Sequence, residues 1–446
     1  MKNQLIELLN AEYLDKAALK ALLPQMNTAD IAEVFEDIKK EDVIQIFRMM
    51  SKGQAAEVFS YIEADEQQII IEAITDSEIG EIINRLFVDD AVDFIEEMPA
   101  SVVKRVLQSA HPEKRKTINQ LLQYPDDSAG SIMTTEYVDL PEDATVQEAF
   151  EEIRTHGINK ETIYTCYVIR QDRFLVGVVS AKKLMLAKPS MRIGDIMDTN
   201  PVFVNTTDDQ EAVADLFKKY GFLAMPVVDK EQQLVGIITV DDIVQVIEEE
   251  NTEDIEKMAA LAPSDDPYLK TSVIRLAKNR IVWLLVLMLS ATITGSIISS
   301  FEDALSVLPA LIAFIPMLMS TGGNAGTQSS TLIIRGMALG EIRLRDILRV
   351  IWMELRIGII CGAALGLINF VRIYLMNGRN ALMAFVITTS LFATVVVAKT
   401  VGCILPMLAK RIRLDPAIMA TPLITTTVDA AALMIYFSIA KIVLMA

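Results

Sequence analysis

Hydrophobic residues recur with a period of 24 along the first 125 residues. The segments ADIAEVF (29–35), GQAAEVF (53–59), SEIGEII (77–83) and SVVKRVL (101–107) align with one another, and a second short amphipathic run follows each. Such units can bury their apolar faces only against their neighbours. The pattern therefore predicts an all-α helical-repeat solenoid over 1–125, a fold whose default role is an interaction scaffold.

A second duplication occupies residues 126–250. GSIMTTEYVDLPEDATVQEAFEEI is echoed by GDIMDTNPVFVNTTDDQEAVADLF, and LVGVVSAKKL is echoed by LVGIITVDDI. Each copy is expected to form a strand, a helix, two short strands and a helix, an α/β arrangement. The two copies resemble a tandem pair of CBS (cystathionine-β-synthase-type) domains, regulatory modules that often bind adenine nucleotides.

In the CBS family, the second strand precedes a Thr/Ser-x-x-Asp motif whose Asp holds a ribose. The second copy has this motif as Thr239 to Asp242, whereas the first has Ser180 but Lys183 in place of the Asp. The resemblance therefore implies at most one intact site for ATP or a related nucleotide. A pair that only dimerises and transmits movement is an equal alternative.

The rest of the chain is dominated by apolar stretches. Five of them, at about 281–301, 304–334, 354–376, 381–407 and 416–441, are long enough to cross a hydrocarbon core of about 30 Å. Twelve flanking Lys and Arg lie on one side and three on the other, which places the first side in the cytoplasm. We therefore expect a multi-pass protein of the cell membrane, with a cytoplasmic N-terminal half and an external C-terminus.

Charge divides the chain in the same place. Residues 1–269 contain 25 Lys+Arg and 52 Asp+Glu, a balance of −27, whereas residues 270–446 contain 16 and 7, a balance of +9. Nucleic-acid binding needs a basic face and is not expected of so acidic a half. The three Cys and two His form no zinc or disulfide pattern, and no phosphate loop or nucleophile–base pair suggests an enzyme.

Asp429 lies in the middle of the last apolar stretch. A carboxylate there costs about 2.5–3.5 kcal/mol on insertion scales and normally faces a bundle interior or a water-filled path. Thr421 and Thr425 precede it at intervals of four, so the three side chains share one helix face. An ion pair with Lys399 is the alternative, but helix rise places the two residues about 15 Å apart in depth. The pattern indicates a cation pathway.

The segment PMLMSTGGNAGTQSS (316–330) has unusual composition for an apolar stretch. Its proline and glycines predict a broken backbone, which is tolerated in a membrane where it lines water. Asn324 adds a neutral oxygen ligand. A kink with small-residue helix packing is the alternative interpretation. Oxygen ligands without sulfur or imidazole suit hard cations, and Mg²⁺ needs only one or two carboxylates plus waters.

The order of these parts, with the segments GGNAGTQ and TTTVDA, resembles the MgtE family of magnesium channels over the whole chain. The resemblance implies a helical N domain (1–125), tandem CBS domains (126–250), a connector helix (251–270) and a five-span α-helical pore domain (271–446). It also implies a homodimer in the lipid bilayer that imports Mg²⁺ along its two-fold axis. The pore ligands would be Asp429, Thr425, Thr421 and Asn324.

The same resemblance implies a gate that cytosolic Mg²⁺ closes by bridging acidic residues of the N domain, the CBS pair and the connector. The matching positions are Asp89, Asp93, Asp209, Glu211, Asp242, Glu250, Glu253, Asp254 and Asp415. Two other functions stay open at this point. One is a proton- or sodium-coupled carrier of divalent cations, and the other is a nucleotide-sensing membrane protein.

Overall fold

The computed structural model describes residues 2–10, 15–264, 268–269, 271–301, 309–376, 380–419 and 421–444. The chain divides into two units, Met1–Ile247 and Glu248–Ala446. The division falls inside one helix, α15 (Val240–Met258), which runs without interruption across the predicted boundary between the CBS pair and the connector.

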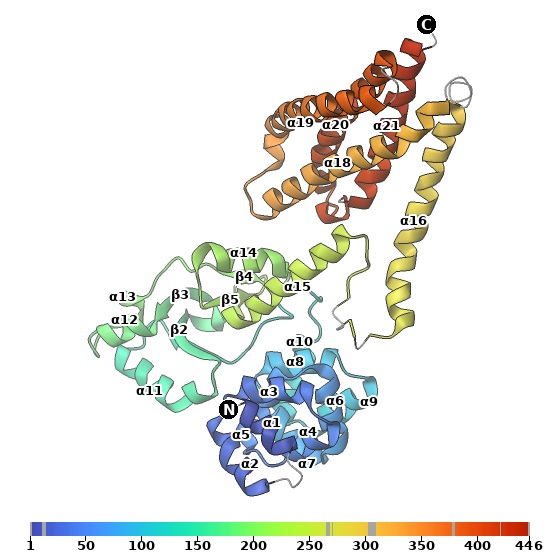
Figure 1. The fold of residues 1–446 in the computed structure, drawn as a ribbon. Coiled ribbons are helices and arrows are strands. Elements are labelled where there is room, and N and C mark those ends of the chain that lie inside the picture. The colour runs from blue at the N-terminus through green and yellow to red at the C-terminus, as the bar shows by residue number, and fades with distance from the viewer. Residues whose placement is uncertain are drawn as a thin grey trace. The chain divides into compact units, whose positions relative to one another are not determined.

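The described residues before 122 form helices joined by short turns (Figure 1). The helices are α1 (Lys2–Asn10), α2 (Lys16–Leu22), α3 (Thr28–Asp37), α4 (Lys40–Phe47), α5 (Lys52–Tyr61), α6 (Ala64–Ala73), α7 (Asp76–Ile83), α8 (Val88–Glu96), α9 (Ala100–Ser109) and α10 (Pro112–Leu121). The 24-residue period is visible in their spacing, because α3, α5, α7 and α9 begin at 28, 52, 76 and 100. Each of these helices packs against the next one in the series.

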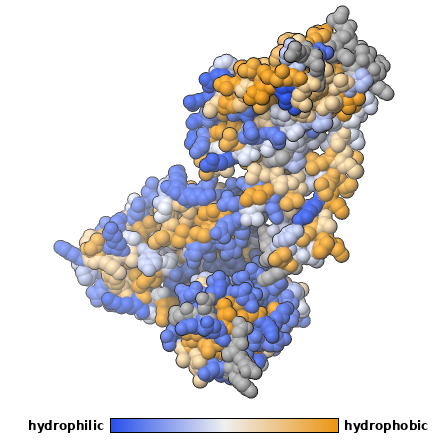
Figure 2. Space-filling view, viewed as in Figure 1, coloured by the Kyte–Doolittle hydropathy of each residue, from blue (hydrophilic) through white to orange (hydrophobic). Residues whose placement is uncertain are grey.

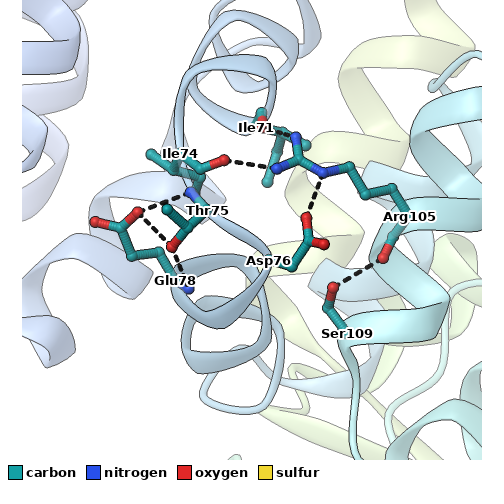
Figure 3. Close-up of polar contacts among 7 residues, drawn as sticks. All are labelled: Ile71, Ile74, Thr75, Asp76, Glu78, Arg105 and Ser109. Atoms are coloured by element: carbon teal, nitrogen blue, oxygen red, sulfur yellow. Dashed lines mark hydrogen bonds and ion pairs between the residues drawn. The ribbon is translucent and has the colours of Figure 1, made fainter.

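Polar contacts also join different repeats. Figure 3 shows Arg105 of α9 reaching to the end of α6, where it donates to the carbonyl oxygens of Ile71 and Ile74, both at 2.7 Å. The same guanidinium contacts Asp76 Oδ1 at 2.6 Å. Thr75 and Glu78 close a capping box at the start of α7, which satisfies backbone donors that the helix cannot pair. The repeats are therefore joined by hydrogen bonds as well as by their apolar faces.

Each CBS copy forms a three-stranded sheet with the predicted order of elements. The first copy contains β1 (Tyr137–Pro141), α11 (Val146–His156), β2 (Thr162–Ile169), β3 (Leu175–Ser180) and α12 (Ala181–Leu186), and α13 (Ile193–Ile196) follows it. The second contains β4 (Val204–Asn205), α14 (Gln210–Tyr220), β5 (Ala224–Val228), β6 (Leu234–Thr239) and α15. In both sheets the first pair of strands is parallel and the second antiparallel. One hydrophobic cluster runs from Leu5 in α1 to Val246 in α15, so the N-terminal helices and the second CBS copy share a core.

The second unit consists of long helices. They are α16 (Val273–Ser300), α18 (Ile315–Ala338), α19 (Ile347–Met376), α20 (Ala381–Arg411) and α21 (Thr421–Leu444), with the short 3₁₀ turns η4 (Pro309–Phe314), η5 (Leu344–Asp346) and η6 (Pro416–Met419). Helices α18, α20 and α21 pack on one another, α19 packs on α20, and α16 packs on α21. Large apolar side chains such as Leu289, Ile360 and Leu367 are more than half exposed. Figure 2 shows hydrophobic side chains over much of the visible surface of this unit.

Four helical segments in the described residues are long and apolar enough to cross a membrane, namely Val273–Ser300, Leu344–Met376, Ala381–Arg411 and Pro416–Val443. The sequence predicts five. Helix α18 is the difference, because its Gly, Ser, Thr, Asn and Gln residues lower its hydropathy and because 302–308 lie outside the described residues.

The predicted break within 316–330 is wrong. Helix α18 is continuous from Ile315 to Ala338, and Pro316 lies in its first turn, where a missing amide donor leaves no helical bond unmade. Pro422 likewise lies in the first turn of α21. The glycines of α18 therefore serve close packing between helices, which is the alternative that the sequence left open.

Candidate functional site

Asp429 lies on α21 with a half-buried side chain. Thr425 lies one turn earlier and is half-buried as well, and its hydroxyl donates to the carbonyl oxygen of Pro422 at 2.9 Å. The hydroxyl oxygen therefore keeps its capacity to accept. The side chain of Thr421 lies outside the described residues. Asp429 and Thr425 thus present oxygen ligands on one face of a helix, the chemistry that hard cations prefer.

The glycines of α18 bring its backbone against this helix. A methyl group added at Gly323 would lie 3.1 Å from Thr425 Cγ2, and one at Gly326 would lie 2.7 Å from Ile424 Cγ2. Asn324, between these two glycines, is exposed, as is Gln328 one turn later. The amide of Asn324 therefore lies on an exposed face of α18, and α18 packs against the helix that holds Asp429.

Lys399 does not pair with Asp429 in the described part of the chain. Its ammonium group donates instead to Ser329 Oγ of α18, at 3.4 Å. The sequence prediction that the two charges lie too far apart to pair agrees with this arrangement. Among the described residues, Lys399 therefore leaves the carboxylate of Asp429 unpaired by its ammonium group.

Two of the predicted regulatory acids lie close together in the first unit. Asp89, in the first turn of α8, is only 6% exposed, and Asp242 lies in the first turn of α15. Burial, followed by the charge of Asp242, raises the pKa of Asp89 well above its usual range. The Asp242 carboxylate accepts a hydrogen bond from Thr239 Oγ1 at 2.6 Å. Burial raises the pKa of Asp242 to about 6 although that bond acts to lower it.

Three further acids surround this pair, and the sequence analysis did not identify them. Burial, and then the charge of Asp242, raises the pKa of Asp90 to about 6 and that of Glu161 to about 8. Glu136 accepts from Val88 N at 2.9 Å and pairs with Lys114 at 3.0 Å. Glu136 and Glu161 precede β1 and β2, which are parallel neighbours. Strand adjacency was therefore the signal that could have found them.

Three more of the predicted regulatory acids lie in the first unit, namely Asp93, Asp209 and Glu211. Asp93 lies on α8, one turn after Asp89. Asp209 is the N-cap residue of α14 and accepts from the backbone amide of Glu211 at 3.0 Å, so one of its oxygens stabilises the start of a helix. Their part in a metal site stays a prediction.

The remaining predicted acids lie in the second unit, around a lysine. Lys257 of α15 contacts Glu253 Oε1 at 2.6 Å and Asp415 Oδ2 at 2.7 Å. Burial acts to lower the pKa of Lys257, but the hydrogen bonds to Asp415 and Glu253 raise it above the ordinary value. Burial, and then the charge of Asp415, raises the pKa of Asp254. Glu250 lies one turn before Asp254 on the same helix. The ammonium group of Lys257 thus links the connector to Asp415, which lies just before the last span.

Neither acidic cluster is a preformed metal cage. In the described residues, no group of three or more His, Cys, Asp and Glu side chains has a geometry that could hold a metal ion directly. Burial is the main cause of the raised pKa values in both clusters, and the negative charge of neighbouring carboxylates adds to it. Mg²⁺ usually keeps several of its waters when it binds, so a site for it does not require such a cage.

Comparison with known families matches most of the chain in four segments. A family model described as a divalent cation transporter, MgtE, matches residues 315–439. The MgtE intracellular N domain matches 26–127, and CBS domain models match 129–190 and 193–249. Each match falls on the elements described above.

Relatives of known name have similar sequences. The chain is 36% identical to the magnesium transporter MgtE of Thermus thermophilus over 434 residues, which make up 96% of each chain. It is 38% identical to the magnesium transporter MgtE of Bacillus subtilis over 358 residues, 80% of this chain and 79% of the relative.

Two solved structures are similar to about half of this chain. The cytosolic domain of the Mg²⁺ channel MgtE in complex with ATP is 35% identical, covers 52% of this chain and 95% of its own length, and has a TM-score of 0.50. The soluble part of a magnesium transporter is 30% identical, covers 56% and 97%, and has a TM-score of 0.52.

Proposed function

Because the chain belongs to the MgtE family of magnesium transporters, we propose that it carries Mg²⁺ across the cell membrane along a path past Asp429. The observation that carries this proposal is the face of α21 that holds the carboxylate of Asp429 and the oxygen of Thr425, packed against the glycines of α18. A single carboxylate per chain suits an ion that crosses with most of its hydration shell.

The path requires a second copy of the chain. Asn324 and Gln328 are exposed in one copy, and polar side chains in a membrane normally face protein or water and not lipid. A two-fold axis beside α18 and α21 would give them that surrounding and set two Asp429 carboxylates opposite each other. We therefore propose a homodimer with five spans per chain, with α18 as the span next to the axis. Thr421 would lie on the same face as Thr425, toward the cytoplasmic mouth.

The replacement of Asp429 by alanine tests the path. We expect Mg²⁺ uptake into proteoliposomes to fall at least tenfold, because the cation loses the carboxylates of Asp429 on the path. Ser438→Ala is the matched control, since it removes an exposed hydroxyl from the same helix. Uptake by Asp429→Ala equal to that of the parent would exclude this path. Uptake that stops when a sodium or proton gradient is dissipated would favour a coupled carrier instead.

We propose that cytosolic Mg²⁺ closes the path by binding to the acidic clusters. The cluster around Asp89 and Asp242 lies between the N domain (1–125) and the CBS pair (126–250). The cluster of Glu250, Glu253, Asp254 and Asp415 lies between the connector (251–270) and the pore domain (271–446). Asp93, Asp209 and Glu211 would add ligands as the parts close. Crowded carboxylates support this role because a divalent ion relieves their repulsion.

A nucleotide is a second ligand that the CBS pair is suited to bind. Asp242 and Thr239 stand in the arrangement expected of a ribose site, with the carboxylate hydrogen-bonded to the hydroxyl, and a structure of a relative's cytosolic domain contains ATP. We expect Asp242→Asn to weaken ATP binding at least fivefold in calorimetric titration, whereas Lys183→Gln in the first copy leaves it unchanged.

A further inference from the structure

A buried charged network joins three helices of the second unit, none of which carries Asp429. Glu354 of α19 and Lys399 of α20 are each 6% exposed, and Ser329 of α18 is 1% exposed. Ser329 Oγ donates to Glu354 Oε2 at 2.5 Å, and Lys399 Nζ donates to Ser329 Oγ at 3.4 Å. One hydroxyl therefore connects an acid and a base in the interior of the helix bundle.

General stability is a weak explanation for such a network. Two charges lose their hydration when they are buried, and well-packed apolar residues often stabilise a protein as much or more. The best attested use of buried polar groups is to fix the register of one helix against another. Ionisable side chains in a membrane also mark functional positions by default.

Helix α18 has a particular need for a fixed register. Small residues make its closest approaches to α20 and α21, although larger side chains such as Leu318 and Met337 also pack in clusters with these helices. A methyl group at Gly322 would lie 2.8 Å from Thr394 Cγ2 of α20, and one at Gly326 would lie 3.3 Å from the carbonyl oxygen of Ala398. Small residues allow two backbones to approach closely, but their smooth surfaces do little to set the axial or rotational position of a helix.

Ser329 and Asn324 occupy different faces of α18. Ser329 is buried toward α19 and α20, whereas Asn324 is exposed. The two residues are five positions apart, about 7.5 Å along the helix axis. A shift or rotation of α18 at Ser329 would therefore move the amide of Asn324 relative to Thr425 and Asp429.

We propose that Glu354, Ser329 and Lys399 are positioning residues for the ion path, which hold α18 in the register that aims Asn324 at the passing ion. The inference rests on the proposed function, because it takes Asn324 to lie on that path. It predicts that the network controls which ions pass, and not only whether the protein folds.

Two variants test this in the full-length protein. Ser329→Ala removes only the bridging hydroxyl. Glu354→Gln combined with Lys399→Met removes both charges together, so that neither is left buried alone. Ser390→Ala is the matched control, because Ser390 of α20 is 0% exposed and its hydroxyl donates to Val386 of its own helix at 2.8 Å. The measurement is the permeability ratio of Mg²⁺ to Na⁺ and of Mg²⁺ to Ca²⁺, from reversal potentials in planar bilayers.

We expect both network variants to lower at least one permeability ratio fivefold or more, while Ser390→Ala keeps the parent values. Ratios within 1.5-fold of the parent in a folded network variant overturn the proposal. If neither variant folds, the network serves folding alone and the proposal is also overturned. Asp429→Ala separates the two hypotheses. If Asp429→Ala loses Mg²⁺ conductance while the network variants keep the permeability ratios of the parent, only the positioning role is refuted. If Asp429→Ala conducts Mg²⁺ normally, the ion path itself is refuted.

Discussion

The carboxylates of Asp90 and Asp242 hold their protons to a higher pH than usual. Burial raises the pKa of both groups to about 6, whereas in an unfolded chain an Asp titrates near 4. Between these values the folded protein binds more protons than the unfolded one. Its free energy of unfolding must therefore fall as the pH rises through this window. The contribution is fully present below about pH 4 and is lost above about pH 6.

This pH dependence can be measured by urea unfolding of residues 1–247 in metal-free buffer. We expect the free energy of unfolding to fall by at least about 1 kcal/mol between pH 4.5 and pH 7.5, since one pKa unit corresponds to about 1.4 kcal/mol. Asp90→Asn combined with Asp242→Asn should make this fall smaller, while Asp89 and Glu161 still contribute to it. An equal slope in the parent and the double variant would contradict the assigned pKa values.

The same residues show how far single positions could be predicted. Asp89 and Asp242 came from a family resemblance, and the structure brings them together. Asp90 and Glu161 were missed, although they carry the same electrostatic signature, because burial and the charge of Asp242 act on them only after the chain has folded. The pairing of Lys257 with Asp415 was missed for the same reason, since 158 positions separate the two residues along the sequence.

At the scale of helices, glycine contacts between α18 and α20 set the helix separation. A methyl group at Gly402 would collide with the carbonyl oxygen of Gly326, whereas nothing lies within 4 Å of one at Gly295 in α16. We expect Gly402→Ala to force α18 and α20 apart and lower the melting temperature of the detergent-solubilised protein by several degrees. Gly295→Ala should leave it unchanged within about 1 °C. Equal melting temperatures would show that the two helices can separate without loss.

The connector is held to the start of the last span by Lys257. Its contacts with Glu253 and Asp415 need no divalent ion, so they should restrain the C-terminal end of α15 when Mg²⁺ is absent. We expect Lys257→Gln to speed amide hydrogen exchange over residues 250–258 several-fold in EDTA. Saturating Mg²⁺ should restore much of the protection, because the ion replaces the missing charge. Lys230→Gln, at an exposed position, is the control. Unchanged exchange in Lys257→Gln without Mg²⁺ would exclude this restraint.

The elements with a regular spacing of hydrophobic residues could be predicted from the sequence. The elements whose conformation depends on packing against other helices could not. The 24-residue repeat and the duplicated CBS pattern both appear in the structure, because local periodicity determines which face each element buries. The continuity of α18 was not predictable from its composition. Pro316 and the glycines match a broken segment as well as a packed helix. Neighbouring helices decide between the two, through contacts such as that of Gly326 with Ile424.

Over the whole molecule, negative charge is concentrated in the part before the membrane segments. Residues 1–269 carry a balance of −27, and two acidic clusters lie at junctions, one within each unit. Like charges at a junction favour its separation, and this repulsion acts until a cation neutralises it. The binding of Mg²⁺ should therefore be coupled to the closeness of the parts, which is the linkage that a gate requires.

Limited proteolysis near Pro263 measures that coupling in the full-length protein. We expect millimolar Mg²⁺ to slow cleavage there several-fold, because closure of the parts covers the end of the connector. Asp89→Asn combined with Asp242→Asn should raise the Mg²⁺ concentration needed for half-protection at least threefold, since the cluster loses two charges that attract the ion. Asp195→Asn, at an exposed position outside both clusters, should leave that concentration unchanged. If cleavage is equally fast with and without Mg²⁺, the ion does not draw the parts together, and the acidic half of the chain has another function.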